Sequence, residues 1–254
     1  MFSGWNLNIL FWVYAVITIG FVGHFLYFLF FQKEKHKRDS ELANIPDSFM
    51  LNRTSREWGV QLVSPIEAFL VKRKVTPVHI SWAGLFFALL ACIFYSFGGF
   101  ALAGWSVVFS GFCDMLDGRV ARRLRMTSQR GEFLDSNLDR LSECLWFLGL
   151  FNFYANTLFF YVVFAAFTGS LMVSYSKARA EGMDVHGRIG IMQRSERIVW
   201  IGVTSILSPL FSAVSNYLVP ISTTFLASVG ISVVAILSCY TYYQRFRHTY
   251  SNLS

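Results

Sequence analysis

The sequence predicts an all-α integral membrane protein, and three observations lead to this fold class. Of its 254 residues 54% are hydrophobic and only 15% charged, which is far too apolar for a soluble chain. Seven stretches are apolar over roughly the 20 residues that a bilayer-spanning helix needs. Backbone groups in lipid must also be satisfied within the segment, which favours helices. The seven stretches are 8–31, 79–97, 99–117, 134–152, 157–176, 198–216 and 218–240.

The distribution of positive charge predicts the topology. The 22 Lys and Arg residues fall in alternate loops, whereas the loops near 98, 153–157 and 214–218 carry none. By the positive-inside rule the charged loops are cytoplasmic, so the N-terminus lies outside and the C-terminus in the cytoplasm. We therefore expect a multi-pass protein of the kind found in a bacterial inner membrane, with its polar residues facing the cytoplasm. The net charge of +7 then has a topological explanation, and nucleic acid is not an expected partner.

The N-terminal part is predicted to be an addition to the bundle. The stretch 8–31 has no basic region before it and no small-residue cleavage site after it, so it is interpreted as a retained transmembrane anchor. A polar linker, 32–48, follows. The segment 57–73 mixes apolar and charged residues at helical spacing, which predicts an amphipathic helix on the inner leaflet, although a linker packed on the bundle fits equally well. The domains are accordingly 1–56, anchor and linker, and 57–254, the main bundle.

Within the bundle, the stretches 79–97 and 99–117 are separated only by Gly98 and Gly99, which predicts a tight helical hairpin. The remaining four stretches follow with short or charged connections and complete the bundle. A polar, highly charged segment joins the stretch 99–117 to the stretch 134–152.

Four aspartates stand at regular spacing in that segment. Asp114 and Asp117 are three residues apart at the end of one apolar stretch, and Asp135 and Asp139 are four apart at the start of the next. Residues at these spacings share a helix face, so two antiparallel helices would bring four carboxylates into a small volume. Clustered carboxylates repel one another and call for hard cations such as Mg²⁺ or Mn²⁺. Paired ions of this kind suit displacement at phosphorus.

The alternative is that the aspartates merely balance the neighbouring arginines at a solvated interface. Intramembrane carboxylates are costly and usually functional, which disfavours that interpretation. The residues between them also suit phosphate binding. Gly118 and Ala121 leave room along the helix for a ligand, and Arg122 follows one turn later.

The pattern resembles a known enzyme family. Asp114-x2-Asp117-Gly118-x2-Ala121-Arg122-x8-Gly131-x3-Asp135-x3-Asp139 matches every fixed position in the signature of the CDP-alcohol phosphotransferases. The resemblance covers about 57–254. It implies a six-helix transmembrane bundle that transfers a phosphatidyl or similar group from a CDP-linked donor to an alcohol and releases CMP. The first transmembrane helix would then be an addition to the family fold.

The resemblance also implies roles for individual residues. Asp114, Asp117 and Asp135 would hold two divalent metal ions, Mg²⁺ or Mn²⁺, and Asp139 would contact one of them and act as the general base. The CDP moiety would contact residues around the signature and in the segment TPVHIS, 76–81. These expected contacts are Pro77, Val78, His79, Ile80, Gly118, Ala121, Arg122 and Ser128.

A second group of basic residues bears on the acceptor. Lys177, Arg197 and Arg245 lie at three cytoplasmic helix ends and would form a cationic pocket, which a phosphorylated polyol needs and serine does not. The alternative for each residue is topological anchoring. The segments around them resemble those of the bacterial phosphatidylinositol phosphate synthases, in which these positions bind the phosphate of inositol 1-phosphate. Gln193 and Ser195 depart from that subgroup, which has an acidic residue and a proline there.

The expected reaction is therefore between CDP-diacylglycerol and inositol 1-phosphate. Glycerol 3-phosphate is the alternative acceptor, as in a phosphatidylglycerophosphate synthase. A cation transporter is a further alternative, but it predicts acidic residues at several membrane depths, whereas these lie at one face. A catalytically inactive scaffold is disfavoured by the intact signature. Besides the substrates and the lipid bilayer, a second copy of the chain is an expected partner.

Overall fold

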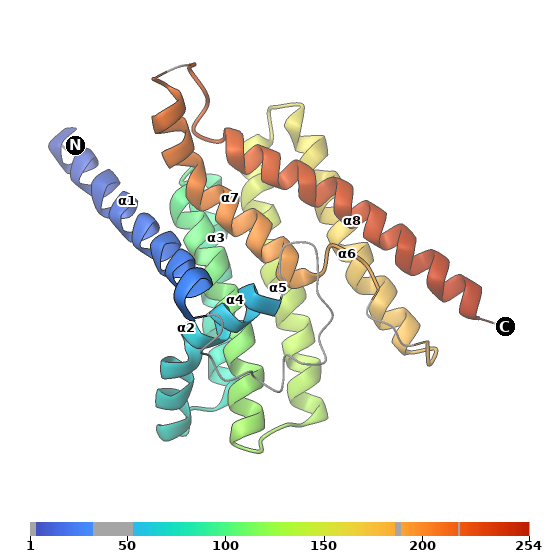
Figure 1. Ribbon diagram of the computed structural model, residues 1–254. Coiled ribbons are helices and arrows are strands. Elements are labelled where there is room, and N and C mark those ends of the chain that lie inside the picture. The colour runs from blue at the N-terminus through green and yellow to red at the C-terminus, as the bar shows by residue number, and fades with distance from the viewer. Residues whose placement is uncertain (1–3, 33–52, 186–188, 218, 254) are drawn as a thin grey trace. The chain divides into compact units, whose positions relative to one another are not determined.

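The computed structural model describes residues 4–32, 53–185, 189–217 and 219–253, and all of the regular secondary structure within them is helical (Figure 1). Most of the predicted linker, 33–48, lies outside the described residues. The all-α prediction is confirmed. The helices are α1 Gly4–Tyr27, a π-helix Phe28–Gln32, α2 Arg53–Lys72, α3 Pro77–Ser96, α4 Phe100–Arg123, α5 Gln129–Tyr154, α6 Phe159–Glu181, α7 Arg194–Ser215 and α8 Phe225–Asn252.

The chain divides into two compact units. The first comprises Met1–Asp47 and Leu51–Leu62, and the second comprises Ser48–Met50 and Val63–Ser254, so the division passes through α2. Inside the first unit, the indole of Trp58 donates a hydrogen bond of 3.0 Å to Nδ1 of His24. The ring of Trp58 also packs edge-on against Phe21. These contacts join α1 to the beginning of α2.

The hairpin between α3 and α4 forms where the sequence predicts it. Gly98 has a φ of +76°, a conformation that residues with a side chain rarely adopt. The amide of Gly98 bonds to the carbonyl of Tyr95 at 3.0 Å, and that of Gly99 to Phe94 at 2.8 Å. These bonds satisfy the last carbonyls of α3 and turn the chain directly into α4.

Helices α3 to α8 form the bundle of the second unit. α3 packs on α4 and α5, α4 on α7, and α8 on both α6 and α7. Two glycines permit the closest approaches. A Cβ on Gly104 of α4 would lie 2.6 Å from the carbonyl oxygen of Gly202 on α7, and one on Gly149 of α5 would lie 2.4 Å from that of Cys92 on α3. Small residues of this kind are what membrane helices use to pack backbone against backbone.

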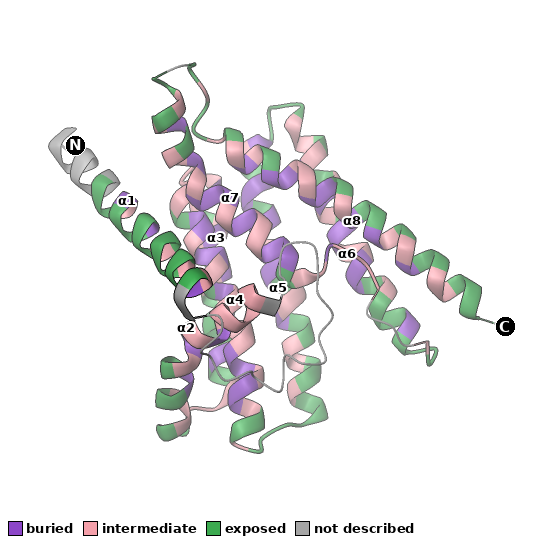
Figure 2. Cartoon of the chain, viewed as in Figure 1, coloured by how far each residue is buried: buried purple, intermediate pink, exposed green. Residues whose placement is uncertain are grey.

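The core of the bundle is built from aromatic and aliphatic side chains of all six helices. Figure 2 shows the buried residues running along their middle turns. Trp146 and Tyr95 are the largest fully buried apolar side chains of this core. Outward-facing apolar residues form stripes instead, such as Trp82, Phe86, Leu89 and Ile93 on α3, as expected for lipid contact.

Six of the described helices are long and apolar enough to cross a membrane: five of the bundle and α1. The one predicted stretch that is not among these six is 134–152. It forms α5, which carries too many charged residues to count as a membrane span by composition. The first four turns of α5 carry Glu132, Asp135, Asp139, Arg140 and Glu143, and this charge lowers its hydropathy. The protein is a multi-pass membrane protein in which the most polar helix is packed among apolar ones.

The second half of α2 is amphipathic, but its apolar residues do not all face one side. Val63 packs with Ile80, Leu116 and Val120 in a separate small cluster, whereas Ile66 and Phe69 are exposed. A fully buried Glu67 holds this part of α2 to α4 through Arg119 Nε at 2.8 Å and Arg123 Nε at 2.5 Å. This half of α2 thus has one face against the bundle and another that is exposed, as in a helix that lies on a membrane surface.

Candidate active site

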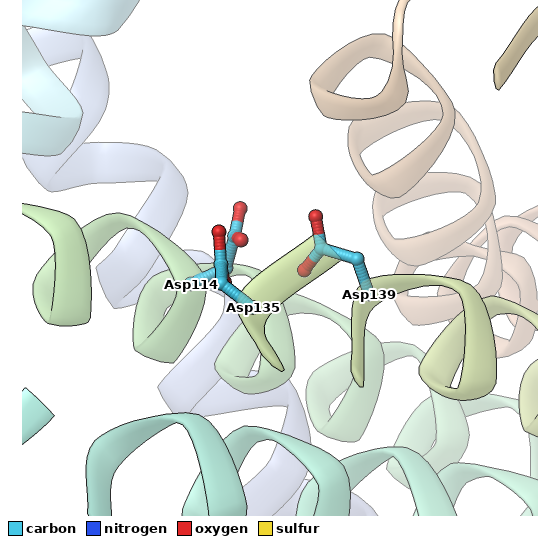
Figure 3. Close-up of side chains that lie close together, drawn as sticks. All are labelled: Asp114, Asp135 and Asp139. Carbon is cyan, nitrogen blue, oxygen red and sulfur yellow. The ribbon is translucent and has the colours of Figure 1, made fainter. Parts of the chain in front are cut away.

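Three of the four predicted aspartates converge. Asp114, near the end of α4, and Asp135 and Asp139, in the first three turns of α5, each present an oxygen within 4.8 Å of the other two. Figure 3 shows the three carboxylates pointing to the same side of the two helices. They converge because the i,i+4 pair on α5 faces the last turns of α4 across a short connection.

Asp117 lines the same cleft but is bound differently. Its Oδ2 accepts a hydrogen bond of 2.6 Å from the hydroxyl of Ser81 on α3, and its side chain is buried. The cleft as a whole lies where α3, α4, α5 and α7 meet. Its lining residues are Ser81, Gly84, Ser110, Asp114, Asp117, Asp135, Leu138, Asp139, Ser142 and Arg194.

The cleft contains an arginine that the sequence analysis did not single out. Arg194 is the first residue of α7, and its Nη1 lies 2.7 Å from Asp114 Oδ1 and 2.8 Å from Asp139 Oδ2. One guanidinium nitrogen therefore bridges carboxylates from two helices. Arg194 stands three residues before Arg197, which the sequence assigns to the acceptor pocket.

Behind this cleft lies a buried ion pair, of which the sequence analysis predicted one member. Arg197 is fully buried, and its Nε and Nη2 donate to Glu143 Oε1 and Oε2 at 2.6 and 3.1 Å. Arg140 Nη1 approaches Glu143 Oε2 at 3.6 Å. In this arrangement the guanidinium of Arg197 faces Glu143, and it also donates to the carbonyl of Met192 at 3.3 Å.

The other two predicted acceptor residues lie in a second pocket, between the ends of α6 and α8. Lys177 is half-exposed there, 3.6 Å from Glu181. Arg245 is largely buried and donates from Nε to the carbonyl of Ile189 and from Nη1 to that of Val173, both at 2.7 Å. The remaining lining residues are Ser176, Ala180, Val185, His248 and Thr249. The structure therefore brings Lys177 and Arg245 to one pocket.

The predicted CDP-contacting residues occupy two places. Pro77, Val78, His79 and Ile80 form the first turn of α3, where the hydroxyl of Thr76 and Nδ1 of His79 are 2.5 Å apart. Gly118, Ala121 and Arg122 lie on the last turns of α4. Ser128 caps α5 by accepting a hydrogen bond of 3.1 Å from the amide of Gly131.

The residues of the cleft fit a divalent cation. The donors are carboxylate oxygens, which suit hard ions such as Mg²⁺ and Mn²⁺. Three carboxylates gathered within 4.8 Å also need positive charge between them, and Arg194 supplies only one unit of it.

A family model supports this interpretation of the cleft. The model of the CDP-alcohol phosphatidyltransferases matches residues 74–239, which include all four aspartates. The chain belongs to this family. The transferase match begins just before α3 and extends into α8, so it covers the bundle and leaves α1 outside.

Relatives of this transferase include proteins named as synthases of inositol phosphate lipids. A phosphatidylinositol phosphate synthase of Streptomyces avermitilis is 32% identical over 203 residues, covering 77% of this chain and 81% of that protein. An archaetidylinositol phosphate synthase of Pyrococcus horikoshii is 36% identical over 173 residues, covering 67% of this chain and 81% of that protein.

Solved structures show the same fold. The phosphatidylinositol phosphate synthase of Mycobacterium tuberculosis with CDP-DAG bound has a TM-score of 0.63 at 24% identity, covering 75% of this transferase and 94% of that chain. The same enzyme in complex with manganese and citrate has a TM-score of 0.62 at 25% identity, covering 74% and 88%.

We predict that Glu143→Gln strongly destabilises the transferase. The change leaves Arg197 buried without its counter-charge, and breaking a buried pair in this way costs about 3–5 kcal/mol. The matched control is Glu181→Gln, because Glu181 pairs with Lys177 at the surface, where such pairs contribute about 0–1 kcal/mol. Thermal unfolding in detergent measures both. Equal melting temperatures for the two variants would contradict the role given to Glu143.

Proposed function

We propose that this transferase moves the phosphatidyl group of CDP-diacylglycerol to a phosphorylated polyol, inositol 1-phosphate, and releases CMP. The observation that carries the proposal is the placement of a carboxylate cleft next to buried arginines, which suits a reaction between two phosphate-bearing substrates. The names of the relatives support the acceptor. The bacterial and archaeal enzymes are named for different lipids, but both names contain inositol phosphate.

The first part of the proposal concerns the aspartates. We assign two divalent ions, Mg²⁺ or Mn²⁺, to Asp114, Asp117, Asp135 and Asp139, all of which line the cleft. When bound, such ions offset the charge of the diphosphate and polarise the phosphorus that is attacked.

The second part concerns the chemical step. Asp139 accepts the proton of the acceptor hydroxyl, and the acceptor oxygen forms a bond to the phosphorus on the lipid side of the diphosphate. The bond between that phosphorus and the bridging oxygen breaks, and CMP leaves with the electron pair. We assign this role to Asp139 because it lines the cleft on the side of Arg194 and Arg140, near which the acceptor phosphate is expected.

The donor is assigned to the two places that flank the cleft. Gly118 is open on one side, and a Cβ there would meet only the tip of Arg122, 3.3 Å away. A diphosphate along this face would contact Arg122, and the cytidine would contact the first turn of α3 from Pro77 to Ile80. Ala121 and Ser128 complete the proposed contacts, with Ser128 at the start of α5.

The acceptor phosphate is assigned to Lys177, Arg197 and Arg245. Arg245 is held by two backbone carbonyls, so its charge is fixed in place, whereas Lys177 extends into the pocket. Arg197 lies close enough to Arg245 to interact with it electrostatically. Because Arg197 is fully buried and bound to Glu143, we propose that it acts on the acceptor phosphate electrostatically and from behind the pocket.

Two further proposals follow from charge and sequence. We place the N-terminus outside and the C-terminus and the cleft in the cytoplasm, because the basic residues lie in alternate loops. We also assign 57–254 to the transferase domain and 1–56 to an anchor with its linker.

The acceptor assignment predicts a specific kinetic defect in Lys177→Ala. A lost charged hydrogen bond of about 1.5–3 kcal/mol should raise the acceptor KM by roughly 10- to 100-fold and leave the donor KM nearly unchanged. Lys177 is preferable to Arg197 for this test, because its side chain is half-exposed and its removal leaves the core intact.

CMP release measured with inositol 1-phosphate, glycerol 3-phosphate and free inositol gives both constants. Arg247→Ala, which removes an exposed positive charge of α8 outside the pocket, is the control. Equal use of free inositol, or an unchanged acceptor KM in Lys177→Ala, would remove the acceptor assignment. If the protein preferred glycerol 3-phosphate, that molecule would replace inositol 1-phosphate as the assigned acceptor, and the reaction class would stay the same.

A second prediction concerns the general base. Asp139→Asn keeps the size of the side chain but removes the proton acceptor, so CMP release should fall by about 10²–10⁴-fold. Asp184→Asn is the matched control, because Asp184 is an exposed aspartate beyond the end of α6 whose positive φ asparagine tolerates. If Asp139→Asn retained a tenth or more of the wild-type rate, another group must take the proton.

A further inference from the structure

Arg194 stands where the aspartates of the cleft would hold a cation. Its Nη1 lies between Asp114 Oδ1 and Asp139 Oδ2, at 2.7 and 2.8 Å. A divalent ion bound to the same two oxygens would lie about 2.0–2.6 Å from each. The nitrogen and the ion therefore compete for one position, and Arg194 has to move before both oxygens can bind a metal.

The contacts of Arg194 suit such a movement. Its backbone is fixed as the first residue of α7, but the guanidinium sits at the end of a long, flexible side chain. That side chain is mostly buried, and its Nε has no hydrogen-bond partner among the residues that the structure describes, which is an energetic cost of the bridging position. Among the described residues, the guanidinium of Arg194 is thus held by its two carboxylates, while its Nε donor stays without a hydrogen bond.

The charged groups around Arg194 determine whether it finds a counter-charge once it leaves the two aspartates. Arg140 lies close enough to repel it. Asp135 of the same cluster also interacts with Arg194, but it is assigned to the metal ions. Glu143 already binds Arg197 with both oxygens and approaches Arg140 with one. A guanidinium pushed from the aspartates by a metal ion therefore lacks a vacant counter-charge among these groups. A phosphate anion entering beside the arginines supplies it.

We propose that Arg194 is a displaceable counter-ion that links metal binding to binding of the acceptor phosphate. Without ligands it pairs with Asp114 and Asp139 and offsets part of their negative charge. When metal and acceptor are bound, it leaves the two carboxylates and pairs with the phosphate of the acceptor. The inference rests on the proposed function for the identity of that phosphate. Because such coupling is reciprocal, phosphate should tighten metal binding as much as metal tightens phosphate binding.

The first test measures Mn²⁺ binding by the purified wild-type protein in detergent, from the electron paramagnetic resonance signal of free Mn²⁺. CDP-diacylglycerol is left out, so no turnover occurs. We expect saturating inositol 1-phosphate to tighten Mn²⁺ binding about fivefold or more, the usual lower range of such coupling. Free inositol should have no effect. An Mn²⁺ affinity that inositol 1-phosphate leaves unchanged would overturn the proposal without the need for a variant.

The second test uses Arg194→Gln, with Arg247→Gln as a matched loss of one exposed positive charge. Arg194→Gln should bind Mn²⁺ about tenfold more tightly without phosphate, equal to about 1.4 kcal/mol, because no side chain competes for the carboxylates. Inositol 1-phosphate should then add little. Arg247→Gln should keep both the wild-type affinity and its response to phosphate.

The outcomes separate this inference from the proposed function. A phosphate response that persists in Arg194→Gln would mean that the phosphate acts directly on the metal, and the role of Arg194 would be refuted. Unchanged Mn²⁺ affinity in Arg194→Gln would refute it as well, while leaving the metal site intact. If wild-type protein bound no Mn²⁺, the metal site of the proposed function would fail, and the inference with it.

Discussion

The mutual repulsion of carboxylates at the junction of α4 and α5 is the constraint on which the rest of this structure depends. Oxygens of Asp114, Asp135 and Asp139 lie within 4.8 Å of one another among helices that are otherwise apolar. Such an arrangement persists only with positive charge close by. In the described residues that charge comes from Arg194, and the chemistry of the carboxylates suits its replacement by divalent cations.

The bundle meets this constraint by close packing away from the cleft and by charge pairing around it. Gly104 and Gly149 let the helix backbones approach each other, so the helix ends that carry the aspartates are held at fixed positions. Around them, Glu143 pairs with Arg197 and Glu67 with Arg119 out of contact with water. These pairs cost desolvation, so we interpret them as devices that position charge and not as the source of stability.

The parts of the site that were predictable from the sequence are those that depend on one helix or on two consecutive ones. Two features were enough to predict the cluster of carboxylates. These are the i,i+4 spacing of Asp135 and Asp139 and the short loop that joins their helix to the one carrying Asp114. The partners of Arg197 and Asp117 were not predictable, because Glu143 and Ser81 lie 54 and 36 residues away and only packing brings them near. For the same reason the bridging position of Arg194 left no signal in its own segment. All seven predicted stretches form helices, and α5 is the most charged of them because the site itself lies on it.

The most direct test of the account is the metal dependence of CMP release by the purified protein with CDP-diacylglycerol and inositol 1-phosphate. The protein is stripped with EDTA and then titrated with Mg²⁺ or Mn²⁺. Because the account makes a cation between the aspartates necessary for attack at phosphorus, it predicts no CMP release in EDTA and recovery with either metal. Undiminished CMP release in excess EDTA would contradict it.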